Sequence, residues 1–218
     1  SIYHMDANYY QSWLTTKYWG DWRTQDKWLW RLSTNHGSMG TLGDIGVHIF
    51  DFASFPIGSI KKLNAKLKTF ESKGDKIKDY VLDANDSFIS MVEFENGALG
   101  TMAVTMLTYP KNLEGSITIL GQYGSVKIGG RAVNSIEHWQ FADSNSDDLL
   151  IKESNYDNPS VYGSGHNDYY SNMIAVLNGE EEPICNGEEG LKSLEIITAA
   201  YQSSFQKKVI KLPLSENN

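Results

Sequence analysis

The sequence has only one cysteine, Cys185, among its 218 residues, so no disulfide can form within the chain. It lacks the run of roughly 18–20 apolar residues that a membrane-spanning helix requires. No charged segment followed by an apolar one marks a secretion signal at its start. These features exclude a disulfide scaffold and disfavour a membrane protein. A lone cysteine is typical of a reducing compartment, so we expect a cytoplasmic protein.

Positive charge is also scarce: the sequence has 19 Lys and Arg and 27 Asp and Glu, which gives a formal net charge of −8. This balance argues against a nucleic-acid duplex as a partner, since phosphate neutralisation needs clustered basic residues. Aromatic residues make up 12% of the chain, which argues against disorder. No linker composition and no internal repeat divides the chain. We therefore predict one domain, residues 1–218, with a substantial core.

Alternating patterns in the middle of the chain and helical patterns near its ends indicate the fold class. Strands are predicted at 1–13, 60–70, 86–94, 98–106, 115–120, 125–128, 135–141 and 208–212, and helices at 42–56, 167–178 and 187–205. Residues 71–81 and 142–165 are predicted to be loops. This order predicts an α+β fold with a large, mainly antiparallel open β-sheet and flanking helices.

The predicted helix after the glycine-rich segment 37–43 has an apolar face formed by Leu42, Ile45, Ile49 and Phe52, and we expect it to end at Pro56 and Gly58. At 100° per residue, Asp44, His48 and Asp51 share a second face at the edge of this stripe. A half-buried histidine held by carboxylates suits general acid–base catalysis, and a surface ion pair is the alternative. Gly46 costs helix stability, so we expect another group, for example a ligand, to approach its backbone. These residues are too few for a metal site, and none is predicted.

Three further groups of residues are candidates for substrate contact. A tryptophan cluster in the irregular, partly helical segment 14–35 can stack on sugar faces or pack inside the protein; it comprises Trp19, Trp22, Trp28 and Trp30. Arg23 and Arg31 in the same segment can bind anions or form ordinary ion pairs. His166 and Tyr169, at the start of the penultimate helix, face a cleft or serve in capping and packing.

Four segments, taken in order, resemble the glucose–fructose oxidoreductase / inositol dehydrogenase (Gfo/Idh/MocA) family. They are GSMGTLGDIGVHIFD at 37–51, DSFISMVEFENGALG at 86–100, ILGQYGS at 119–125 and the tail 166–212, which contains GEEGLKSLE at 187–195. The likeness covers nearly the whole chain. It departs from the family at Ser38, where glycine is common.

The resemblance implies a two-domain oxidoreductase of which this chain is the C-terminal domain, with a fold like that of the dihydrodipicolinate/glyceraldehyde-phosphate dehydrogenase C-terminal domains. The N-terminal Rossmann domain, which would bind NAD or NADP and carry a Glu-Lys-Pro lysine, lies outside this chain. This chain alone is therefore expected to be inactive. It would shape the site for a sugar, inositol or nucleotide-sugar substrate and form a homo-oligomer through its sheet face.

By motif match, His48 would transfer the proton at the substrate hydroxyl, and Asp44 would bind substrate or orient His48. The role of Asp51 is left open. The other expected substrate-binding residues are Trp22, Arg23, Arg31, His166 and Tyr169. The alternative is a sugar-binding or assembly module that kept the fold and lost the reaction.

Overall fold

The computed structural model describes residues 1–17, 20–71, 73–109, 114–130, 135–141, 149–155 and 164–215. The helices are α1 (Asp26–Leu29), α2 (Val47–Ile57), α3 (Ser164–Leu177) and α4 (Gly187–Gln206), with short helical turns η1 (Trp30–Leu32), η2 (Thr34–His36) and η3 (Leu42–Gly46). The strands are β1 (Ile2–Tyr10), β2 (Ile60–Lys68), β3 (Asp75–Ile77), β4 (Tyr80–Leu82), β5 (Ser87–Phe94), β6 (Leu99–Thr105), β7 (Glu114–Gly121), β8 (Gly124–Gly130), β9 (Ser135–Phe141), β10 (Leu149–Asn155) and β11 (Ile210–Lys211).

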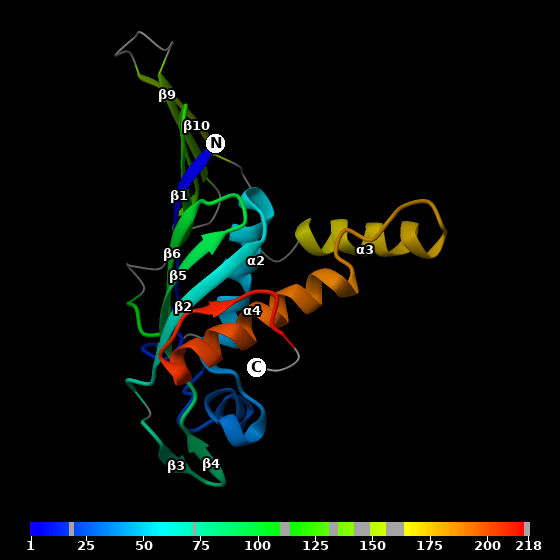
Figure 1. The fold of residues 1–218 in the computed structure, drawn as a ribbon. Helices are drawn as coiled ribbons and strands as arrows, with labels where there is room; N and C mark the ends of the chain where they lie inside the picture. The colour runs from blue at the N-terminus through cyan, green and yellow to red at the C-terminus, as the bar shows by residue number, and fades with distance from the viewer. Residues whose placement is uncertain are drawn as a thin grey trace.

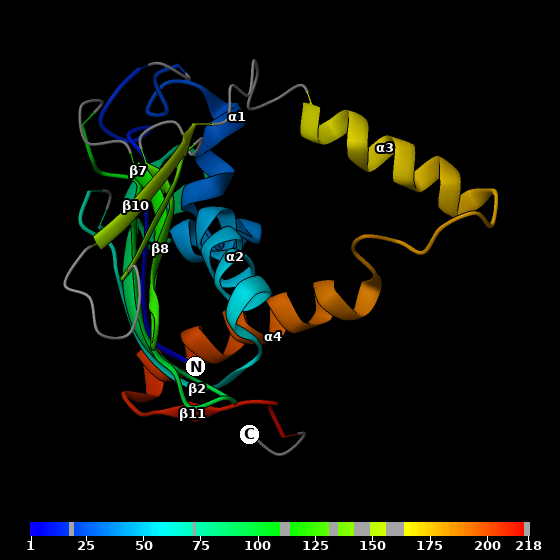
Figure 2. The same ribbon diagram turned by 90° about the horizontal axis from the view of Figure 1, so that it is seen from above.

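Nine strands form one sheet in the order β10-β9-β8-β7-β1-β6-β5-β2-β11. All of its neighbouring strands are antiparallel except the central pair β1 and β6, which is parallel. Helices α2 and α4 lie on one face of the sheet, and in the described residues no helix covers the other face (Figures 1 and 2). The predicted α+β fold with a mainly antiparallel open sheet is confirmed.

Three local predictions were wrong. Residues 71–81 were predicted to be a loop but include β3 and part of a hairpin with β4, because short polar strands carry little alternation. Residues 149–155 form β10 within the predicted loop 142–165, where pairing with β9 overrides a polar composition. Pro56 does not end α2, which continues through Ile57; the other predicted terminator, Gly58, is confirmed as its C-cap, with a φ of 114°.

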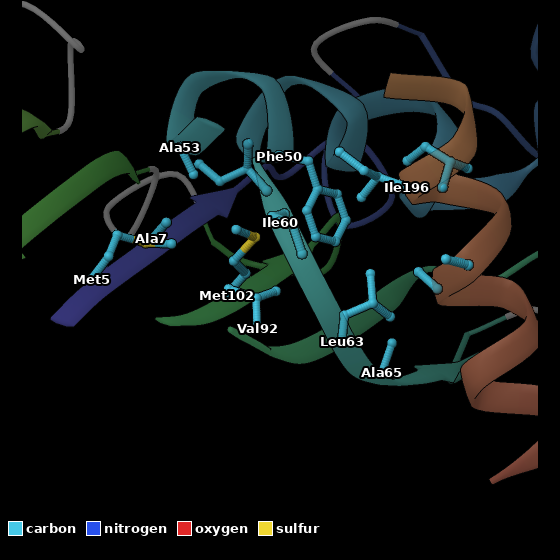
Figure 3. Close-up of a cluster of buried hydrophobic side chains, with 14 of the residues drawn as sticks. Met5, Ala7, Phe50, Ala53, Ile60, Leu63, Ala65, Val92, Met102 and Ile196 are labelled. Carbon is cyan, nitrogen blue, oxygen red and sulfur yellow. The ribbon is translucent and has the colours of Figure 1, made fainter. Parts of the chain in front are cut away.

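The main core lies between the sheet and helices α2 and α4 (Figure 3). Alternation along the strands sends every second side chain to this layer, as Leu63 and Ala65 do on β2 and Val92 does on β5. Phe50 of α2 is fully buried, and its ring stacks on that of Phe88 at a centroid distance of 5.9 Å. The predicted apolar face of the helix therefore packs on the sheet, which fixes the direction of its other face.

A second, smaller core fixes the tryptophan-rich segment to the end of the sheet. It joins residues of 14–32 to the β3–β4 hairpin and to the residue after β6, and consists of Leu14, Trp22, Leu29, Leu32, Leu82 and Met106. This core places the segment beside the start of α2.

The uncovered face of the sheet carries large apolar side chains on adjacent strands. The exposed fractions are 62% for Ile89 and Met91 on β5, 54% for Leu99 on β6 and 40% for Leu120 on β7. Polar groups lie between them, and the Thr101 hydroxyl donates a hydrogen bond to the Asp6 carboxylate across the β1–β6 pair. This face therefore combines exposed apolar side chains with hydrogen-bonded polar ones.

Candidate functional site

The outer face of α2 carries the strongest candidate residue, His48. The helix buries Ile49, Phe50, Ala53 and Ile57 toward the core. His48, Asp51 and Phe55 are therefore on the exposed side, and Phe55 is 91% exposed. Among the residues that the structure describes, none forms a hydrogen bond or ion pair with the His48 imidazole. The expectation of a half-buried histidine was wrong, and the ring is open to a group from outside.

Asp44 bonds to Arg31 and not to His48. The Arg31 guanidinium donates to Asp44 Oδ1, and the two side chains are 33% and 30% exposed. Residues Leu42–Gly46 form a π-helical turn, which holds more residues per turn than the 3.6 assumed for the shared face. The register between Asp44 and His48 is therefore shifted. Such turns are frequent at functional sites.

Gly46 is required by the protein itself rather than by a ligand. A Cβ placed there would lie 2.5 Å from Cε1 and 2.8 Å from Cζ of Phe88, much closer than side chains tolerate. Phe88 is 2% exposed and belongs to the main core. The glycine thus lets the helix approach β5 closely, which fixes the depth at which His48 and Asp44 are held.

Asn85 holds the start of this helical segment from the strand side. Its Oδ1 accepts a hydrogen bond from Leu42 N at 3.0 Å, and its backbone oxygen accepts one from Thr41 N at 2.7 Å. Its Nδ2 donates to Tyr201 Oη at 2.7 Å and to Met39 O at 3.1 Å. These bonds satisfy N–H groups that a helix start leaves without partners.

Tyr201 of α4 completes this network, because its hydroxyl donates to Met39 O. Burial raises the pKa of Tyr201 to about 12, and the hydrogen bond from Asn85 opposes part of that shift. The glycine-rich turn is fitted to the same network: at Gly40, with φ of 59°, a Cβ would lie 2.4 Å from Asn85 O. Ser38, the departure from the family pattern, donates to Arg31 O and accepts from Gly40 N at 2.9 Å.

Arg31 forms an ion pair that links the tryptophan-rich segment to the helical turn that carries Asp44. Its guanidinium carbon lies 5.1 Å from the Trp30 ring centroid and 5.7 Å from that of Trp28. Trp30 is 44% exposed, so an aromatic surface adjoins the Arg31–Asp44 pair. Such a surface can stack on a sugar ring or a base.

Two other candidates, Trp22 and Arg23, contact residues outside α2 and stabilise the tryptophan-rich segment. Trp22 is 4% exposed, and its Nε1 donates to Leu14 O at 3.1 Å. Arg23 lies over the Trp22 ring at 4.1 Å and pairs with Glu71. No described interaction joins either residue to α2. Trp19 lies outside the described residues.

The candidates at the C-terminal end are not brought to His48 by this chain. Tyr169 of α3 is 53% exposed and contacts the ring of Tyr170 at 5.9 Å. Helix α3 stands away from α2 and from the sheet (Figure 2). The side chain of His166 lies outside the described residues.

Within the described residues, no group of three or more His, Cys, Asp or Glu could hold a metal ion. No helix among them is long and apolar enough to span a membrane.

The open sheet with helices α2 and α4 on one face is the architecture of oxidoreductase C-terminal α/β domains. The family model described as "Oxidoreductase family, C-terminal alpha/beta domain" matches residues 13–212. The chain belongs to the Gfo/Idh/MocA oxidoreductase family, which confirms the resemblance noted in the sequence.

Relatives of this chain include dehydrogenases. Levoglucosan dehydrogenase of Pseudarthrobacter phenanthrenivorans is 29% identical over 112 residues, 44% of this chain and 29% of that protein. The WlbA dehydrogenase of Bordetella pertussis, solved with NADH and UDP-GlcNAcA, is 30% identical with a TM-score of 0.71 over 98% of this chain and 55% of that one. The levoglucosan dehydrogenase complex with NADH has a TM-score of 0.82 at 18% identity and shows the fold alone; this chain covers 59% of it.

Proposed function

We propose that this chain is the substrate-binding domain of an NAD- or NADP-dependent oxidoreductase that acts on a hydroxyl of a sugar, an inositol or a nucleotide sugar. The observation that carries the proposal is His48, exposed and unpaired within the described residues on a helix held rigidly by Gly46 and Asn85. An imidazole in that state can take the proton of a substrate hydroxyl as general base.

The surroundings of His48 supply groups that could orient a sugar. Asp44 Oδ1 is bonded to Arg31, and its Oδ2 has no partner among the described residues, so Oδ2 is free to accept from a second substrate hydroxyl. The exposed Trp30 ring beside Arg31 offers a stacking surface. Of the three substrate classes, the nucleotide sugar is favoured, because solved relatives at 30% and 32% identity are complexes with UDP-GlcNAcA.

The cofactor would be held outside this chain. Its sequence has no G-x-G-x-x-G turn, and no described helix follows a strand through such a turn to cradle a pyrophosphate. The chain spans 55% and 59% of the two dehydrogenase chains described above, so those chains have room for a further domain. A bound nicotinamide supplies the hydride acceptor. The contribution of this chain is substrate orientation by Asp44 and proton transfer by His48.

The test is turnover by the full-length protein with NAD or NADP and three substrates: UDP-GlcNAcA, levoglucosan and inositol. We expect His48→Ala to lower kcat about 10²–10⁴-fold while the affinity for the cofactor is retained. His138→Ala, on β9 near the sheet edge, is the matched control and should leave kcat unchanged. Turnover that persists in His48→Ala would refute the role of His48. Substrate binding without turnover in the wild type would favour a non-catalytic sugar-binding module.

We also propose that the protein forms a homo-oligomer through the uncovered sheet face, supported by the exposed Ile89, Met91 and Leu99. Met91→Glu should weaken self-association at least about tenfold, because a charge would enter an apolar interface. Tyr123→Glu, at the turn between β7 and β8, is the control for an added charge elsewhere. Sedimentation velocity at several protein concentrations measures the self-association of the wild type and of both variants. A wild-type monomer at all concentrations would overturn the proposal.

A further inference from the structure

Helix α3 exposes a continuous apolar stripe. The exposed fractions of its large side chains lie between 49% and 76%, for Tyr169, Tyr170, Met173, Ile174 and Leu177. At 100° per residue these five positions fall within an arc of about 140°, the width of a packed helix face. A helix face of this composition is normally buried against another element.

The attachment of α3 to the rest of the chain uses a different side of the helix. Asn172 is 9% exposed, and its Nδ2 donates to Glu181 Oε2 at 2.8 Å and to Glu182 O at 3.0 Å. Its Oδ1 accepts from Ile184 N at 3.0 Å. These bonds fix α3 to the loop that leads into α4. The apolar stripe therefore points away from the Asn172 hydrogen bonds that hold the helix to this loop.

The first half of α4 continues this exposed surface. Leu191 and Leu194 are 66% and 54% exposed, whereas Ile196 and Ile197, farther along, are buried. Helix α4 thus leaves the sheet and projects outward to α3 (Figure 2). We call residues 169–194 the arm. It lies on the same side of the sheet as α2, the side that presents His48.

We propose that the arm is the docking surface for the dinucleotide-binding domain that the proposed function places before this chain; the inference rests on that function. More than two fifths of the WlbA and levoglucosan dehydrogenase chains lie outside the region matched here, enough for such a domain. Since the arm and the outer face of α2 lie on one side of the sheet, one body can cover both. Docking on the arm would hold its cofactor toward His48.

The charges around the arm favour a protein partner with a basic rim. Carboxylates border the apolar stripe at Glu180, Glu181, Glu182, Glu188 and Glu189, and only Glu189 is paired with a lysine, Lys192, among the described residues. Such a border repels an anionic lipid surface. It suits an apolar patch on a domain that is framed by Lys or Arg.

The experiment measures hydrogen exchange of the α3 amides in the full-length protein. The wild type should show protected amides over 164–177. The double variant Ile174→Glu/Leu177→Glu should speed their exchange about tenfold or more, while the amides of the sheet stay unchanged as evidence of folding. Ser171→Glu, which adds the same charge about 130° from the centre of the stripe, is the matched control and should behave as the wild type.

Three outcomes would overturn the inference. The first is rapid α3 exchange in the wild type that the double variant does not change. The second is protection that depends on protein concentration, because a second copy would then cover the arm. The third is an equal effect of Ser171→Glu. Binding of NADH and of NADPH, measured by fluorescence on the same samples, separates the two proposals: binding of either one without α3 protection refutes docking alone, and binding of neither refutes the proposed function.

Discussion

Replacing Gly46 by alanine tests whether close packing on β5 fixes the position of the helix that carries His48. The added Cβ would lie 2.5 Å from Phe88 Cε1 and 3.3 Å from Leu42 Cδ1. The Phe88 ring cannot easily move, because it is 2% exposed and is stacked on Phe50 at an interplanar angle of 10°. We therefore expect Gly46→Ala to destabilise the protein, although alanine is the better helix former.

The change in the free energy of unfolding caused by Gly46→Ala follows from two opposing effects. Overpacking a core costs about 1–3 kcal/mol, and replacing glycine by alanine within a helix recovers about 1 kcal/mol. Gly190→Ala in α4 is the matched control, since nothing lies within 4 Å of its added Cβ. It should stabilise the protein by about 0.5–1 kcal/mol. The free energies of unfolding of the two variants should therefore differ by about 1–3 kcal/mol, which is the packing cost alone.

The assay is urea unfolding, with circular dichroism as the signal and an unchanged m-value as evidence of the same transition. In a Phe88→Leu background the ring is gone, and Gly46→Ala should then behave like Gly190→Ala. If Gly46→Ala stabilises the protein that retains Phe88 as much as Gly190→Ala does, the ring does not confine the helix, and the explanation for Gly46 is wrong.

Two further predictions concern the network around the helix start. Asn85→Ala leaves Leu42 N without its acceptor and should lower the free energy of unfolding by about 2–4 kcal/mol in urea titrations; a loss below about 0.5 kcal/mol would show that Asn85 is not a cap. For Tyr201, whose pKa burial raises from 10.0 to about 12, the fold favours the protonated phenol, so stability present below pH 10 should fall as the pH rises toward 12. Tyr201→Phe should weaken this decline, and identical pH profiles would contradict the assignment.

Local patterns were sufficient to predict much of the fold. Alternation predicted β2 and β5 because each strand buries only one face. The apolar positions of the helix predicted which of its faces packs on the sheet. The position of His48 on the other face follows from the same periodicity, which is why the sequence could single it out.

The environment of His48 could not be predicted in the same way, because it depends on residues distant in sequence. Arg31, which forms an ion pair with the Asp44 carboxylate, lies 13 positions before Asp44 in the sequence. Asn85, which accepts a hydrogen bond from Leu42 N, lies 43 positions after Leu42. The π-turn has no signature in apolar periodicity and shifts the register on which the shared face was based. The only local signal for these contacts is the small, polar pair Asn85-Asp86 at the start of a strand.

The position of β1 at the centre of the sheet affects how the chain folds. Asp6 pairs with Thr101 on one side and with Thr118 on the other, so both neighbours of the first strand come roughly a hundred residues later. During translation at about 5–20 residues per second, this strand would wait about 5–20 seconds with both edges unpaired. Such a high contact order slows folding and exposes strand edges to aggregation. The first ten residues can therefore join the two halves of the sheet only after β7 has been synthesised, and a chaperone that shields this strand would have its largest effect in that interval.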